Sequence, residues 1–353
     1  MKYKISDIAE INKKTVNKNY KGKVFYLDTS SVTDDFFDCP KIYTSLKDAP
    51  SRARRLAENG DTIISTVRPA MKHVGYISQN LNRVYSTGFA IISPKKSKVD
   101  PFYLYLVLSS KKITDLLQSI AVGSTSAYPS IKPYDIGKLT FDFPSLSIQE
   151  KIASIIKKII LKIKINNRIN DNLLELAKAV FNKNVNSCSK TLLSNYFLPK
   201  RGKNLVKKNV IPGAIPVIAG GMIPAAFHNK SNTMAPVITI SASGANAGYV
   251  QIWGIRVWSS DSSFIDESVS NNIYFWYLLL KKYQKQIYES QTGSAQPHIY
   301  PKNIGNLLIP VVSDETRLNI NEKVKPIFNN IFENKHENNL LNNLKIILLE
   351  KYF

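Results

Sequence analysis

The sequence predicts an α+β fold in which two pseudo-two-fold-related α/β domains are separated by a long antiparallel two-helix coiled coil. Three observations lead to this prediction: the chain repeats itself once, each copy contains short strand-like segments, and each copy ends in a long helical pattern. The chain has 353 residues, of which 44% are hydrophobic, so each copy can bury a core of its own.

The repeat is clearest in residues 129–139 and 297–307, which share proline, isoleucine, proline, isoleucine, glycine and leucine at the same positions. Other matches follow in the same order, namely 102–108 with 273–279, Gly123-Ser124 with Gly293-Ser294, and 148–152 with 320–324. An ordered series of matches at offsets of 168 to 172 residues indicates two copies of a unit of about 170 residues, with small insertions between the matches. Two copies are too few for a solenoid and favour a pseudo-two-fold arrangement.

Each copy ends in apolar residues at spacings of three, four and seven, the pattern of a helix with one apolar stripe. The stripe residues are Ile148, Ile152, Ile155, Ile159, Ile163, Leu173 and Leu176 in the first copy, and Ile320, Val324, Ile327, Ile331, Leu341, Leu344 and Leu348 in the second. Residues 334–339 weaken the second stripe at its middle. Pro326 is expected in the first turns of its helix, where proline is best tolerated.

The first of these helices would be about 50 Å long, too long to bury its stripe against one domain of ordinary size. The other copy offers a partner of similar length, so an antiparallel pair is expected. The alternative is that each helix packs on its own globular domain.

The segments before the helices have the β-branched and aromatic content of strands. The expected strands are 23–28, 61–67, 73–78 and 88–93 in the first copy, and 214–219, 236–241, 247–251 and 255–258 in the second. Residues 101–120 and 271–288 are expected to form helices with aromatic faces that belong to the core. The predicted division is therefore 1–144, a long helix over 145–186, 187–312, and a second long helix over 313–353.

The net charge of +22, from 48 basic and 26 acidic residues, favours a polyanionic partner such as nucleic acid. The charge is clustered: residues 151–250 carry fifteen basic and two acidic side chains, and no acidic residue lies between Glu175 and Asp261. A basic surface that only keeps the protein soluble is the alternative.

Neither catalytic nor metal-binding residues can be assigned from the sequence. It has no phosphate-binding loop of the GxxxxGK[ST] type, and residues 244–248 are interpreted as a turn. There is no Asn/Asp-Pro-Pro-aromatic string of an amino-methyltransferase and no grouped carboxylates for a nuclease metal. The N-terminus lacks the apolar segment of a signal peptide, and the most apolar run is interrupted by lysines, so a cytoplasmic protein without a membrane partner is expected.

Residues 136–152 lead into the first long helix, and with the repeat they resemble the specificity subunits of Type I restriction–modification systems. The similarity is to the motif Ile-Pro-x-Pro-x-Leu-x-x-Gln-x-x-Ile, with which that family's conserved helix begins. The second copy departs from it, because residues 309–320 lack the Pro-x-Leu and the Gln.

The resemblance implies that each globular segment is a target-recognition domain reading one half of a split site in double-stranded DNA. It implies that the helices fix the separation and dock adenine-methylating modification subunits, and that an ATP-dependent restriction subunit joins them. No cofactor is expected in this chain; S-adenosylmethionine, ATP and Mg²⁺ belong to the partner subunits.

Basic side chains would contact phosphates, and a few would read base edges. The candidates are Arg52, Arg54, Arg55, Arg68, Lys72 and Arg83 in the first copy, and Lys200, Arg201, Lys203, Lys207, Lys208, Lys230 and Arg256 in the second. Arg68 and Arg201 lie near the turn-like prolines Pro69 and Pro199. Two other functions stay open: a stand-alone nuclease or methyltransferase with a divergent site, and a structural adaptor built on the coiled coil.

Overall fold

The computed structural model describes residues 2–123, 129–185, 188–293 and 296–353, and the chain divides into two compact units. Unit 1 comprises Met1–Lys162 and Leu341–Phe353, and unit 2 comprises Ile163–Leu340. Both contain helices and strands, as predicted. Ser124 and Ser294 of the Gly-Ser turns, and the predicted boundary between residues 186 and 187, lie outside the described residues.

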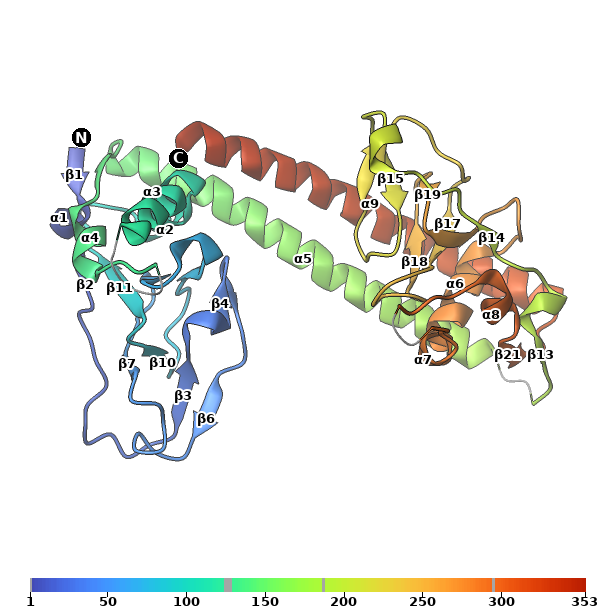
Figure 1. The fold of residues 1–353 in the computed structure, drawn as a ribbon, viewed down its shortest axis with the longest axis horizontal. Coiled ribbons are helices and arrows are strands. Elements are labelled where there is room, and N and C mark those ends of the chain that lie inside the picture. Colours follow the sequence, from blue (N-terminus) through green and yellow to red (C-terminus); the bar gives the residue numbers. More distant parts are fainter. Residues whose placement is uncertain (1, 124–128, 186–187, 294–295) are drawn as a thin grey trace. The chain divides into compact units, whose positions relative to one another are not determined.

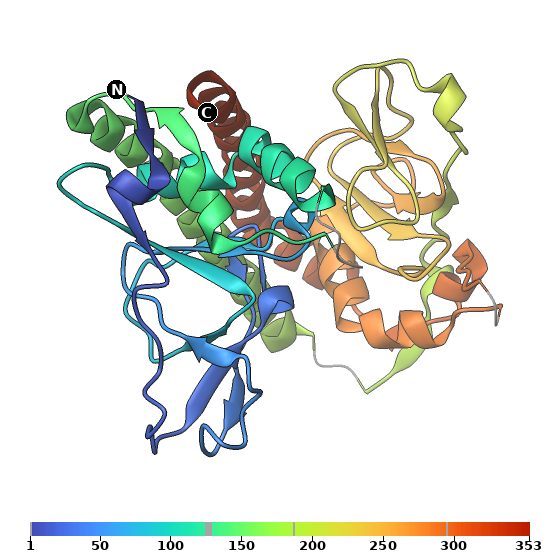
Figure 2. The same cartoon turned by 60° about the vertical axis from the view of Figure 1, so that its left-hand side comes forward.

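Unit 1 contains two four-stranded sheets (Figures 1 and 2). The first is antiparallel throughout, in the order β2 (Ala9–Ile11), β11 (Phe89–Pro94), β8 (Thr62–Ser65) and β9 (Val74–Tyr76). The second has the order β6 (Lys41–Tyr43), β3 (Val24–Leu27), β10 (Val84–Ser86) and β7 (Ala53–Arg55), and its β3–β10 pair is parallel. The remaining elements are the pairs β1 (Lys2–Lys4) with β12 (Thr140–Asp142) and β4 (Val32–Thr33) with β5 (Phe36–Phe37), and the helices α1 (Ile5–Ile8), α2 (Pro101–Ser109), α3 (Lys111–Val122) and α4 (Pro133–Lys138).

Unit 2 repeats this topology. Its antiparallel sheet has the order β14 (Lys200–Arg201), β20 (Ser262–Ile265), β17 (Val237–Ser241) and β18 (Val250–Trp253). Its second sheet has the order β16 (Ala226–His228), β15 (Ile215–Ile218) and β19 (Trp258–Ser259), and its β15–β19 pair is parallel like β3–β10. The remaining elements are β13 (Lys190–Leu192) with β21 (Leu308–Pro310), and the helices α6 (Ile273–Lys282), α7 (Gln284–Glu289) and α8 (Pro301–Gly305).

The spacing between equivalent elements changes along the chain. β3 begins at residue 24 and β15 at residue 215, an offset of 191, whereas β12 begins at 140 and β21 at 308, an offset of 168. Unit 1 has the additional strands β4, β5 and β7 between β3 and β8, which changes the offset. The repeat in the sequence is therefore visible only in the later half of each copy.

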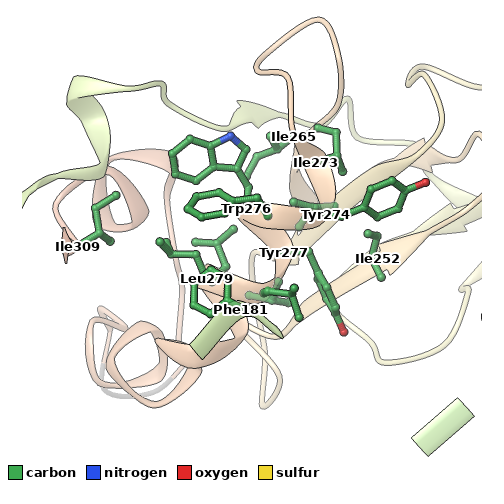
Figure 3. Packing of buried hydrophobic residues seen from close by; sticks show 14 of the residues in the cluster. Phe181, Ile252, Ile265, Ile273, Tyr274, Trp276, Tyr277, Leu279 and Ile309 are labelled. Atoms are coloured by element: carbon green, nitrogen blue, oxygen red, sulfur yellow. The ribbon is translucent and has the colours of Figure 1, made fainter. Parts of the chain in front are cut away.

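The aromatic faces of the predicted helices lie in the cores, as expected. In unit 2, Tyr274, Trp276 and Tyr277 of α6 lie in the core (Figure 3). Phe275 is also buried, and the Trp276 ring meets Phe197 edge-on at 4.9 Å between centroids. In unit 1, Tyr103 of α2 is buried and packs against Phe353, with ring centroids 5.0 Å apart. Burial of rings of this size is a large favourable term in folding.

Two helices of 39 residues end the copies, α5 (Leu146–Asn184) and α9 (Asp314–Tyr352). The predicted apolar stripes divide between buried and exposed positions. Ile152, Ile159, Ile320, Val324 and Ile331 are buried, and Ile163, Leu173, Ile327, Leu341 and Leu348 are half-buried. By contrast, Ile148, Ile155, Leu176 and Leu344 are 47%, 50%, 52% and 44% exposed. Packing within each unit therefore buries only part of each apolar stripe and leaves the rest exposed to solvent.

Pro326 does not lie where the sequence predicted. Helix α9 begins at Asp314, so Pro326 lies in its interior and not in its first turns. Proline there cannot donate the backbone hydrogen bond to the carbonyl of Glu322. The starts of α5 and α9 place Arg317, and not Asn321 as the match of 148–152 with 320–324 would, at the position of Gln149. The Gln149 amide donates to the Pro144 carbonyl at 2.9 Å, and the Arg317 guanidinium donates to the carbonyl of Val312.

Asparagines join α5 to α9 within unit 2. The Nδ2 of Asn166 donates to the Oδ1 of Asn338, the Nδ2 of Asn338 to the Oδ1 of Asn167, and the Nδ2 of Asn334 to the Oδ1 of Asn170, each at 2.9 Å. Residue numbers rise along one helix as they fall along the other, so the two helices run antiparallel here. Asn166 is fully buried and Asn338 is 7% exposed, so this polar contact is buried. The Nδ2 of Asn166 also donates to the Oε2 of Glu337 at 2.7 Å.

We expect Asn338→Ala to lower the free energy of unfolding by about 1 kcal/mol, because the buried Asn166 amide keeps its bond to Glu337 but loses the one to Asn338, and the Asn167 Oδ1 loses its donor. The double variant Asn166→Leu/Asn338→Leu removes both polar groups and should lose much less. Urea unfolding of the full chain, followed by circular dichroism, measures both. A double variant less stable than the single one would contradict this account of the seam.

Candidate nucleic-acid interface

A tight turn after β8 carries two of the predicted cations. Arg68 and Lys72 flank a short 3-10 helix, Pro69–Met71, and both have left-handed backbone angles, with φ of 50° and 52°. This conformation costs a residue other than glycine about 1–2 kcal/mol. Both residues are exposed, whereas Pro69 between them is buried.

Unit 2 has the same turn with glycines at both ends. Gly244 and Gly248 have φ of 78° and 86°, which is a conformation that glycine adopts without steric cost. The Arg68 N–H donates to the Pro129 carbonyl at 2.9 Å, and the Gly244 N–H donates to the Pro297 carbonyl at 3.1 Å. The repeated prolines therefore anchor equivalent turns, and the prediction of a turn at residues 244–248 is confirmed.

The other four arginines of unit 1 lie on or beside β7 and β10. Arg52 is exposed in the turn before β7, whereas Arg54, Arg55 and Arg83 are half-buried. Burial lowers the pKa of the Arg55 guanidinium, and its Nε has no hydrogen-bond partner among the described residues. Burial raises the pKa of Tyr85 to about 12, and a hydrogen bond with Arg83 opposes that increase.

Two of the unit 2 candidates already have protein partners. The Lys200 Nζ donates to the Ser268 carbonyl at 3.1 Å, and the Arg201 Nη2 lies 2.8 Å from the Asp261 Oδ1. The sequence did not predict this ion pair, because 60 residues separate the two partners. Asp261 is the residue that ends the long stretch without acidic side chains.

The remaining unit 2 candidates are exposed. Lys207 and Lys208 lie on a 3-10 helix, Lys207–Asn209, and Lys203 precedes it. Lys230 follows β16, and Arg256 lies between β18 and β19. Exposed lysines with hydrated surroundings suit phosphate contacts, which add affinity without reading sequence.

The described parts of the chain contain no group of three or more His, Cys, Asp or Glu residues placed to hold a metal ion. Within the same residues, each helix is too short or too polar to cross a bilayer.

Comparison with known proteins gives one family. The sequence profile of the Type I restriction modification DNA specificity domain matches residues 1–175 and 198–343. The HindI specificity subunit of Haemophilus influenzae is 29% identical over 51% of this chain, a match that spans 39% of that subunit's length. The MjaIX specificity subunit of Methanocaldococcus jannaschii is 21% identical over 84% of this chain and 77% of its own. The crystal structure of a Type I S subunit from M. genitalium has the same fold, with a TM-score of 0.69 over 100% of this chain and 96% of that chain, at 17% identity.

We expect Lys207→Ala/Lys208→Ala to weaken DNA binding equally for all sequences. If each lysine displaces counterions from one phosphate, the slope of log K against log salt should become shallower by roughly two. Fluorescence anisotropy of a labelled duplex at several salt concentrations measures the slope. Lys285→Ala is a matched control, since the Lys285 side chain is 90% exposed on α7 but outside the candidate surface, and an equal effect there would contradict the assignment.

Proposed function

Because the chain belongs to the Type I restriction modification DNA specificity family, we propose that it is the specificity subunit of a Type I restriction–modification complex. In this role it selects a DNA sequence and leaves methylation and cleavage to other subunits. The observation that carries the proposal is the repeated topology: two units of one fold, each with exposed basic residues, suit a target read in two halves.

The target-recognition domains are assigned to residues 1–144 and 187–312. The helices over 145–186 and 313–353 form the antiparallel two-helix coiled coil that separates them and sets the distance between half-sites. The antiparallel asparagine contacts between α5 and α9 support this pairing. A rigid helix pair suits the role because half-sites on a duplex are spaced by whole numbers of base pairs.

The exposed apolar positions of the long helices are the proposed docking surface for modification subunits. Ile148, Ile155 and Leu176 of α5 and Leu344 of α9 are each between 44% and 52% exposed. Burying such side chains against a partner is favourable. The partner subunits would bring S-adenosylmethionine, ATP and Mg²⁺ and methylate adenine, and an ATP-dependent restriction subunit would join them. A complex of this kind acts on DNA in the cytoplasm.

The two alternatives have less support. A nuclease or methyltransferase would need a metal or cofactor site, and the described residues offer no carboxylate cluster for one. A structural adaptor would need only the helix pair, which leaves the basic residues of both units without a role.

We expect selection from random duplexes with the full chain to enrich two short motifs at one fixed spacing. Two recognition units at a set distance require this outcome, whereas an adaptor would enrich nothing.

The purified chain should leave DNA unmethylated until modification subunits and S-adenosylmethionine are added, as incorporation of a labelled methyl group would reveal. Methylation or cleavage by the chain alone would overturn the division of labour.

A further inference from the structure

The turn that Arg68 and Lys72 flank differs from its copy in unit 2 in one chemical respect. The backbones agree, with left-handed residues at both ends and the hydrogen bond to the following proline carbonyl retained. A second shared bond joins the Met71 N–H to the Arg68 carbonyl and the Ala247 N–H to the Gly244 carbonyl, each at 2.9 Å. Two cations in unit 1 therefore occupy positions whose geometry favours glycine.

The unit 2 turn has room for a side chain at one end only. A Cβ on Gly248 would lie 2.9 Å from the Ile287 side chain and 3.1 Å from that of Ile299, so this end of the unit 2 turn is packed against its core. A Cβ on Gly244 would meet nothing within 4 Å. In unit 1 the residues at both ends, Arg68 and Lys72, are exposed to solvent.

The backbone of the unit 1 turn is held on several sides. The Gln118 Oε1 on α3 accepts from the Ala70 N–H at 3.0 Å, and the Lys72 carbonyl accepts from the Asp34 N–H at 2.9 Å. Pro69 is buried beneath the turn. Strained backbone that its surroundings hold in place is concentrated at functional sites in proteins, and a fixed backbone limits the directions in which an arginine can reach.

We propose that the Arg68–Lys72 turn is the base-reading element of unit 1, with Arg68 contacting a guanine edge in the major groove and Lys72 a neighbouring phosphate. This inference rests on the proposed DNA-specificity function. The planar guanidinium of arginine can donate two parallel hydrogen bonds to the O6 and N7 of guanine, whereas a lysine ammonium is a point charge. The Asp34 N–H donates to the Lys72 carbonyl, so an acidic residue lies beside the Lys72 end of the turn. Arg68, at the other end, is therefore the side chain better suited to contact a base.

The uncharged Gly244–Gly248 turn of unit 2 cannot make these contacts. The two half-sites are therefore read by different devices built on one fold. Substituting glycine at residue 68 gives unit 1 the residue that unit 2 has at the equivalent position, so it separates the role of the side chain from the integrity of the turn.

The experiment compares the full wild-type chain with Arg68→Gly, Arg68→Asn and Lys72→Asn. Glycine and asparagine both tolerate the left-handed backbone, so each variant should keep or raise the melting temperature. Duplexes selected from a random pool by each protein give the base preferences, and anisotropy gives the affinity for the wild-type duplex.

For both Arg68 variants we expect at least about a tenfold loss of affinity, with preference lost at one or two positions of one half-site only. The other half-site and the spacing should stay unchanged. Lys72→Asn should weaken binding to all duplexes without altering base preference. Lys98→Ala is the matched control: Lys98 is an exposed lysine of unit 1 that donates to the Asp7 carbonyl, and its removal should change neither property.

Unchanged preference and affinity in both Arg68 variants would overturn this inference while leaving the proposed function intact. A lower melting temperature in both, with preference lost in both half-sites, would also overturn it, because Arg68 would then support the fold. A wild-type chain that selects no sequence would overturn the proposed function and this inference with it.

Discussion

The burial of long apolar stripes is the constraint on which the rest of this structure depends. A helix of 39 residues is stable in water only when its apolar face is covered, because helix propensity alone contributes little. Within unit 2, the end of α5 and the beginning of α9 pack with the aromatic residues of α6 in one core. Within unit 1, Ile152 and Ile156 of α5 lie in the core that Leu348 and Leu349 of α9 contact. Each unit thus includes a part of both helices.

The buried asparagines add direction to this packing. Apolar side chains tolerate sliding of one helix along another, but a buried amide that loses its partner is costly. The contact between Asn166 and Asn338 therefore favours one register of the pair. Leucines at the same positions would pack without specifying that register.

The duplicated units show how one topology can carry two different sets of side chains. The order of the strands, the parallel pair in the second sheet and the turn after β8 or β17 recur in both units. The side chains on that frame differ, as the cations of one turn and the glycines of the other illustrate. Shared backbone hydrogen bonds hold the frame in both units, so exposed side chains can vary without a change of fold.

The sequence by itself determined the duplication, the two long helices, the core position of the aromatic residues and a minority of the strands. The predicted strand segments coincide with β3, β8, β9, β11, β15 and β17, overlap part of β18, and meet β19 only at Trp258. Those features depend on local periodicity and on repeated motifs, which a linear reading detects. Only the tertiary structure decided which apolar residues are buried, because Ile148 and Ile152 fit the same helical spacing and differ in what packs against them. It also revealed why residues 334–339 interrupt the stripe, since the partners of Asn334 and Asn338 are on a helix more than 160 residues away. The same holds for Arg201 and Asp261, and for the left-handed backbone at Arg68: long-range pairing and backbone strain arise from contacts that no spacing in the sequence encodes.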